Sequence, residues 1–149
     1  MGVHAFALCF KGSGGAPVGD PPTVTVESRT QATMLTTAFK KEGVASDRVN
    51  KGDGQEAVFQ SKVAMTGEGV FDEWGTIDYG HGNSVTFSTV GRGHLGPSPL
   101  PGVQSGAVIW QIDGGTGTYE NARGYITSNF TIHPDGVVVD HQFAVIFVP

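Results

Sequence analysis

Short runs in which hydrophobic and polar residues alternate recur along the whole chain, and glycine, proline and aspartate separate them. Alternation places successive side chains on opposite faces of an extended backbone, so these runs predict β-strands. The short turns between them favour antiparallel pairing of strands that follow one another in the sequence. We expect strands at residues 3–10, 23–28, 31–39, 57–65, 69–80, 83–93, 106–113, 123–132 and 136–148.

Three segments between these runs lack the alternation. Residues 11–22 predict a long loop, and residues 40–56 predict a surface loop because their glycines outweigh the one plausible helical turn. Residues 93–106 contain three prolines and therefore could not form a central strand. That segment is expected to be either a lid over one end of the fold or a plain surface loop.

The strand count and the near absence of helical segments predict an all-β protein with one domain over residues 1–149. Its 23 glycines and its low charged fraction of 15% fit such a fold better than a helical bundle. Closing the sheet removes the exposed edges that a sandwich would leave, and eight strands suit this length. We expect a single closed antiparallel β-barrel of about eight strands, with a calycin-like architecture. No internal repeat stands out.

Charge and cysteine content narrow the functional classes. The net charge is −5 with only nine Lys and Arg residues, and Lys40–Lys41 is the densest basic spot, so nucleic-acid and anionic-membrane binding are not expected. The single cysteine, Cys9, excludes an intrachain disulfide and predicts a small buried hydrophobe. The five histidines lack the spacing of metal ligands, so no metal site is expected.

No apolar run approaches the length of a membrane span, which predicts a soluble, cytoplasmic protein. If a leader had been removed, the triplet beginning at Asn129 would instead become a candidate glycosylation site.

The glycine cluster Gly114, Gly115 and Gly117 could be either a phosphate-binding loop or a tight corner of a barrel. A phosphate loop needs a helix after its glycines, but residues 124–132 are rich in β-branched and aromatic residues and predict a strand. The lysine of a nucleotide loop is also missing. The cluster is therefore interpreted as a barrel corner that needs glycine for close backbone approach.

The segment GGTGTYENARG, residues 114–124, resembles the GGTGxFxxAxG signature of the barrel superfamily that includes plant allene oxide cyclases and dirigent proteins. Tyr119 stands where that signature has phenylalanine. The resemblance implies a closed barrel that holds a small, largely apolar, reactive molecule and controls its cyclisation or coupling without a cofactor. The functional acidic and asparagine residues of the family lie near its N-terminus and have no residue-by-residue match here.

The candidate catalytic residues depend on which side chains face the lumen of the barrel. Glu73 and Tyr79 share one face of their strand, and a carboxyl group beside aromatic surface in a dry cavity could act as a general acid. The alternative is that Glu73 faces water while Trp74 packs in the core. His141 could be an acid or base if it points inward, and otherwise it is a surface or rim histidine. Asn129 would donate to an oxyanion from an inward position, although the rule of polar residues outside favours the surface.

Four further residues are candidates for contacting a ligand. Two are tryptophans. One of them, Trp110, is adjacent to Gln111, so only one of these two side chains can point into the lumen. The others are an aromatic residue of the last strand and a cation at the start of the proline-rich segment. The four are Trp74, Trp110, Phe143 and Arg92.

We therefore expect a cofactor-free isomerase or cyclase that confines a small, mainly apolar intermediate, with secondary metabolism as a possible setting. The alternative is a non-catalytic, lipocalin-like protein that binds a small apolar ligand. A third expectation is an oligomer of identical subunits whose interface is the apolar C-terminal strand.

Overall fold

The computed structural model describes the backbone of residues 2–13, 23–39 and 45–149, and the side chains of residues 2–12 and 57–149. In this part of the chain every regular element is a strand except one turn of 3-10 helix, η1 (Gly117–Tyr119). The strands are β1 (Gly2–Ser13), β2 (Thr23–Phe39), β3 (Ala45–Gly67), β4 (Val70–Asp78), β5 (Ser84–Thr89), β6 (Gly93–Pro97), β7 (Gln104–Thr116), β8 (Arg123–Ile132) and β9 (Val137–Val148).

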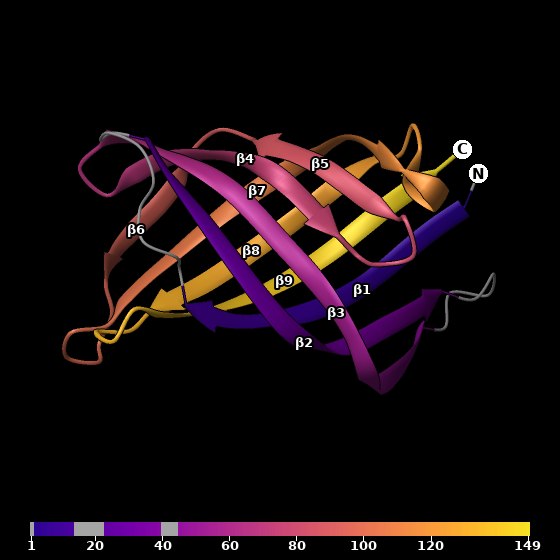
Figure 1. Ribbon diagram of the computed structural model, residues 1–149, viewed down its shortest axis with the longest axis horizontal. Helices are drawn as coiled ribbons and strands as arrows, with labels where there is room; N and C mark the ends of the chain where they lie inside the picture. Colours follow the sequence, from indigo (N-terminus) through magenta and orange to yellow (C-terminus); the bar gives the residue numbers. More distant parts are fainter. Residues whose placement is uncertain (1, 14–22, 40–44) are drawn as a thin grey trace.

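The strands form a closed antiparallel barrel, which confirms the expected all-β architecture (Figure 1). Following the pairings from β1 to β2, β3, β4, β5, β7, β8 and β9 leads back to β1. Strand β6 pairs with both β4 and β7, so β4, β5, β7 and β6 make a smaller circuit in the wall. Strands of opposite walls cross in Figure 1, as the tilt of barrel strands requires.

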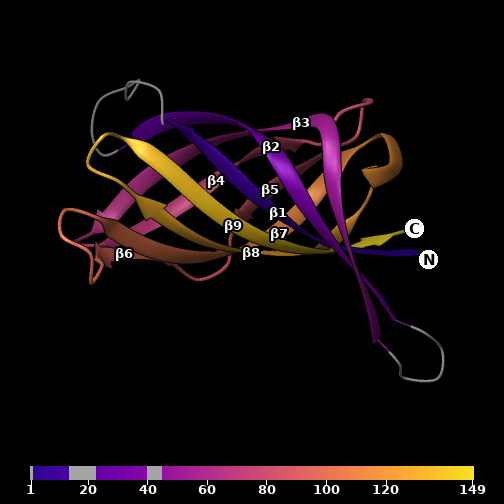
Figure 2. The same cartoon turned by 90° about the horizontal axis from the view of Figure 1, so that it is seen from below.

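Strands β2 and β3 are longer than the alternation predicts. The runs at 23–28 and 31–39 form one strand, and the predicted loop at 45–56 is wrong because these residues belong to β3. The pairing continues from Gln31 opposite Glu56, across a bulge, to Phe39 opposite Ala45. A neighbouring strand that satisfies each backbone group can hold polar, glycine-containing sequence extended. Figure 2 shows this hairpin reaching beyond the barrel. Residues 14–22 and 40–44, including Lys40–Lys41, lie outside the described residues.

The proline-rich segment is also only partly a loop. Residues 93–97 form β6, whose partner residues in β7 run from Ala107 to Gln104. Pro97 ends the strand, and the chain then turns back with a hydrogen bond from the Ser98 N–H to the Val103 carbonyl, 2.9 Å long. The expectation of a loop is therefore wrong for residues 93–97 and 104–106, which lie in strands, and is confirmed for residues 98–103. Proline is tolerated in β6 because the strand is short and stops there.

The corner expected at the glycine cluster leads into a strand, β8, as predicted. Gly117 has φ +60°, and a Cβ there would come within 2.4 Å of Asn83 Oδ1. A Cβ at Gly124 would lie 2.0 Å from the Val145 carbonyl oxygen, so glycine lets β8 and β9 approach closely. Ala122 is completely buried beneath this corner.

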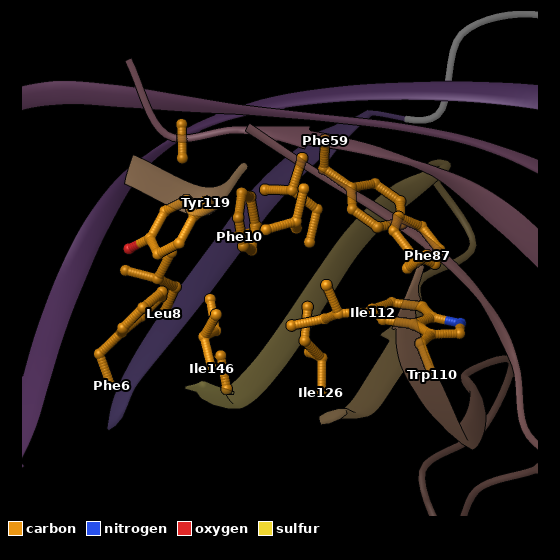
Figure 3. Close-up of a cluster of buried hydrophobic side chains, with 14 of the residues drawn as sticks. Phe6, Leu8, Phe10, Phe59, Phe87, Trp110, Ile112, Tyr119, Ile126 and Ile146 are labelled. Atoms are coloured by element: carbon orange, nitrogen blue, oxygen red, sulfur yellow. The ribbon is translucent and has the colours of Figure 1, made fainter. Parts of the chain in front are cut away.

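The core consists of side chains from the inward rows of the described strands. Phe59, Phe87 and Trp110 form its aromatic centre, with 4.4 Å between the ring centroids of Phe87 and Trp110 (Figure 3). Phe6 and Tyr119 lie toward the other side of the same view. Each of these large rings contributes more hydrophobic stabilisation than a smaller side chain would, because it buries more apolar surface.

Both edges of β9 are paired, with β1 on one side and β8 on the other. Any contact between copies through this strand would therefore use its outer face rather than a free edge. Large apolar side chains do lie exposed on that face and its neighbours: Val3, Tyr125, Phe143 and Phe147.

Candidate functional site

Two carboxyl groups face the inside of the barrel, from strands that lie opposite each other in the ring. Glu73 belongs to β4 and Asp140 to β9, and each is only 7% exposed. Three strands separate β4 from β9 in either direction around the ring. Buried carboxyl groups are costly unless they are hydrogen-bonded or neutral, so each of these positions needs a local explanation.

Glu73 is held by neighbours on both adjacent strands. Ser61 Oγ donates to Glu73 Oε1 at 2.6 Å from β3. The Thr89 hydroxyl accepts from the Glu73 N–H and donates to the Glu73 carbonyl, both at 2.7 Å. Thr89 thereby replaces strand pairing at the point where β4 passes from its partner β6 to its partner β5. Burial raises the pKa of Glu73 from about 4.5 to about 8, despite the opposing effect of Ser61.

The Asp140 carboxyl group accepts two side-chain hydrogen bonds, whereas the Glu73 carboxyl group accepts one, from Ser61. Ser128 Oγ donates to Asp140 Oδ1 at 2.6 Å, and Gln142 Nε2 donates to Asp140 Oδ2 at 2.7 Å. Burial raises the pKa of Asp140, whereas both hydrogen bonds act against that increase. Two donors favour the charged carboxylate more than one does.

The two carboxyl groups occupy equivalent places in two equivalent hairpins. Ser61 precedes Glu73 by twelve residues, and Ser128 precedes Asp140 by the same interval. The segments read SKVAMTGEGVFDE (61–73) and SNFTIHPDGVVVD (128–140), with serine, glycine and valine at matching positions. Their registers also match, because Met65 pairs with Phe71 as Ile132 pairs with Val138. The two hairpins therefore share one local arrangement of serine, turn and acid.

Burial is the main cause of the raised pKa of Glu73, and the charge of Asp140 acts in the same direction. Glu73 keeps its proton to about pH 8. The indole N–H of Trp110 lies close enough to favour the charged form of Glu73, but it makes no hydrogen bond of acceptable geometry. The site thus combines two buried carboxyl groups, of which Glu73 is protonated at neutral pH, and the unpaired N–H donor of Trp110.

The structure does not bring Glu73 and Tyr79 into one site. They share an inward face, as expected, but six residues of extended strand separate them by roughly 20 Å. Tyr79 packs edge-on against Phe6 and Tyr119, with ring centroids 5.3 and 5.6 Å away. Tyr119 also contacts His4, whose Nδ1 is 3.4 Å from the phenol oxygen. Burial raises the pKa of both tyrosines, so both hydroxyl groups stay protonated.

Asn129 and His141 lie together on the outer surface rather than in the lumen. Strand register aligns His94, Ala107, Asn129, His141 and Cys9 in one row across five strands. The first four of these line an open groove of about 790 Å³. The surface interpretation of His141 therefore holds. Cys9 also faces outward and is partly exposed, so the expectation that it is buried is wrong; partial burial raises its pKa and keeps it a thiol.

Of the four candidate ligand contacts, only Trp110 reaches the interior, where it is 1% exposed while Gln111 faces out. Trp74 and Phe143 are more than a third exposed, because their neighbours Glu73 and Gln142 take the inward positions. Arg92 lies exposed in the turn between β5 and β6. The structure thus places Trp74, Phe143 and Arg92 outside the lumen.

The sequence did not identify Asp140, because alternation alone does not show which row of β9 side chains faces inward. Asp140 and Gln142 alternate with His141 and Phe143, and a bulky row is easily mistaken for the inward one. The usable signal was the repeated spacing of a serine and an acid around a hairpin turn. Among the residues whose side chains are described, no three His, Cys, Asp or Glu side chains gather as a metal site.

Comparison with known proteins gives no family model, no curated protein and no solved structure that matches the chain. The resemblance of residues 114–124 to the allene oxide cyclase and dirigent superfamily therefore remains a prediction. No helix among the described residues is long and apolar enough to cross a membrane.

Proposed function

We propose that the protein is a cofactor-free isomerase or cyclase that moves a proton on a small, mainly apolar carbonyl compound held inside the barrel. The observation that carries this proposal is the facing pair of buried carboxyl groups with unequal support. Pairs of acids whose surroundings separate their pKa values are typical of acid and base roles at one site. The resemblance to a superfamily that confines reactive apolar molecules points the same way.

In this mechanism Asp140 is the base. Its carboxylate removes a proton from the carbon beside the carbonyl group, while Ser128 and Gln142 keep it in place. Glu73 donates its proton toward the carbonyl oxygen, which becomes an enol. Where the compound also has a carbon–carbon double bond next to that carbon, Asp140 then returns its proton to the far end of the double bond, the double bond moves into conjugation with the carbonyl group, and the enol proton goes back to Glu73. One C–H bond breaks and another forms, so no oxidant or reductant is consumed.

The test is proton exchange in D₂O with a panel of small cyclic and aryl ketones, followed by NMR. We expect Asp140→Asn to slow exchange by about 10²–10⁴-fold, the usual contribution of a positioned base. Glu73→Gln should also slow it, and the wild-type rate should fall as pH rises through about 8, when Glu73 loses its proton. Glu68→Gln is the control, because Glu68 is an exposed acid in the turn that leads to β4.

Circular dichroism of each variant separates loss of the reaction from loss of the fold. If the protein binds ketones but exchanges none of their protons, it is the non-catalytic carrier instead. If exchange occurs and Asp140→Asn leaves its rate unchanged, the roles given to the carboxyl pair are wrong.

A further inference from the structure

Trp110 carries a hydrogen-bond donor that has no partner. Its Nε1 is fully buried and is the one buried side-chain nitrogen or oxygen left unpaired among the side chains described. An indole N–H can only donate, and leaving such a group unpaired costs about 1–3 kcal/mol. Native proteins rarely keep such a group without a reason, and a catalytic role or a bound water or ion is among the established reasons.

The surroundings of Trp110 show what kind of group is missing. One side of the ring system is occupied by Phe87 and Phe59, whose centroids lie 4.4 and 5.5 Å away (Figure 3). The nitrogen lies near the Glu73 carboxyl group and favours its charged form. Ser61 already occupies Glu73 Oε1, so a protonated Glu73 has its second oxygen available as a donor. Two donors, from β7 and β4, therefore lie beside an apolar aromatic surface.

We infer that Trp110 Nε1 binds an oxygen atom of the ligand, and that this ligand is a planar, mostly apolar molecule with a carbonyl oxygen. The inference rests on the proposed function, because it adds a second donor to the oxygen that Glu73 protonates. Two donors at one oxygen stabilise the negative charge that develops there during proton removal. Trp110 then determines specificity: hydrocarbons of the same shape leave its N–H unpaired and bind less well.

The alternative is that Trp110 serves Glu73 alone and donates to it once that carboxyl group is charged. In that case substitution of Glu73 changes the environment of the indole N–H, but a bound carbonyl compound does not. These two interpretations differ in one NMR signal.

The experiment uses acetophenone and ethylbenzene, which share an apolar aromatic frame and differ in the carbonyl oxygen. The chain has two tryptophans, so its ¹H–¹⁵N spectrum contains two indole signals that Trp74→Phe and Trp110→Phe assign. We expect acetophenone to move the Trp110 indole proton downfield and to leave Trp74 unchanged. Ethylbenzene should cause no such downfield shift.

Affinity gives a second measure. Trp110→Phe keeps an aromatic ring and removes the N–H, so it should weaken acetophenone about three- to tenfold, equivalent to one hydrogen bond, and leave ethylbenzene unchanged. Trp74→Phe, at an exposed tryptophan, should affect neither probe. The inference is overturned if Trp110→Phe weakens both probes equally, if acetophenone fails to bind at millimolar concentration, or if only Glu73→Gln moves the indole signal.

These outcomes are separate from those of the proposed function. Carbonyl-selective binding that depends on Trp110, without proton exchange, would keep this inference and reject the isomerase. Proton exchange that depends on Asp140 but not on the Trp110 N–H would do the reverse.

Discussion

At the scale of single residues, the interior of the barrel keeps two acids that a purely structural core would avoid. An unpaired charge in an apolar interior is strongly unfavourable, so burial raises the pKa of a carboxyl group and the group stays protonated. Glu73 takes this course, whereas two hydrogen bonds support the charge of Asp140. The two acids are equally buried and differ in their hydrogen-bond partners.

The raised pKa of Glu73 predicts how stability varies with pH. The unfolded group titrates near pH 4.5 and the folded group near 8, so the folded state binds more protons between these values. The contribution of Glu73 to stability is therefore fully present below pH 4.5 and is lost as pH rises toward 8. The loss is on the order of 4 kcal/mol for Glu73 alone, and Asp140 adds to it because its pKa is also raised. Urea unfolding at a series of pH values measures it.

The Glu73→Gln variant isolates the contribution of this residue. Its free energy of unfolding should decline less than that of the wild type between pH 5 and pH 9, whereas Glu68→Gln should follow the wild type. Parallel curves for wild type and Glu73→Gln would show that Glu73 is charged at neutral pH and cannot be the acid.

At the scale of elements, the hairpins β3–β4 and β8–β9 have the same local arrangement. In each, a serine on the first strand supports an acid on the second, and a glycine with positive φ closes the turn. Gly69 has φ +65° and Gly136 has φ +83°. The turns differ in their surroundings, because β6 crosses near the first: Leu95 donates its N–H to the Gly69 carbonyl at 2.8 Å.

Alanine at these two glycines should therefore have unequal effects. At Gly136 nothing lies within 4 Å of the added Cβ, so only backbone strain of about 1–2 kcal/mol is expected. At Gly69 the same Cβ would also lie 2.4 Å from the Leu95 carbonyl oxygen, which is backbone and must shift. We expect Gly69→Ala to cost at least twice as much as Gly136→Ala in urea unfolding. Equal costs would mean that the backbone of β6 moves away from the added methyl group without a measurable loss of stability.

The alternation of residues predicted most strands and the closed barrel, because both depend on local pattern and chain length. It missed residues 45–56 and β6, where pairing with a neighbour decides the conformation. The site was predicted only at Glu73 and Trp110. Asp140 could not be selected, because alternation gives two rows for each strand and does not say which row faces inward. Only closure of the barrel resolves that choice.

At the scale of the whole molecule, closure explains why two similar hairpins make one site. In a flat sheet β4 and β9 would be far apart, but in the ring they face each other across the interior. In a closed barrel each strand also has a row of side chains that faces outward. On β1, β8 and β9 this outer row exposes several large apolar side chains. Val3 is 54% exposed, Tyr125 57%, and Phe147 41%. Val3 pairs with Phe147, so the two lie adjacent.

Contiguous apolar surface of this kind commonly mediates protein association. The expectation of an oligomer through the C-terminal strand therefore takes a specific form: copies associate through the outer face of β1, β8 and β9. We expect sedimentation velocity to show a concentration-dependent oligomer of the wild type. Phe147→Lys should shift it toward monomer, because a charged side chain in the contact would lose its water. Leu100→Lys is the matched control, since Leu100 is 62% exposed in the turn between β6 and β7. A monomer at every concentration, or equal effects of the two substitutions, would refute an interface on this face and leave the interior site as it is.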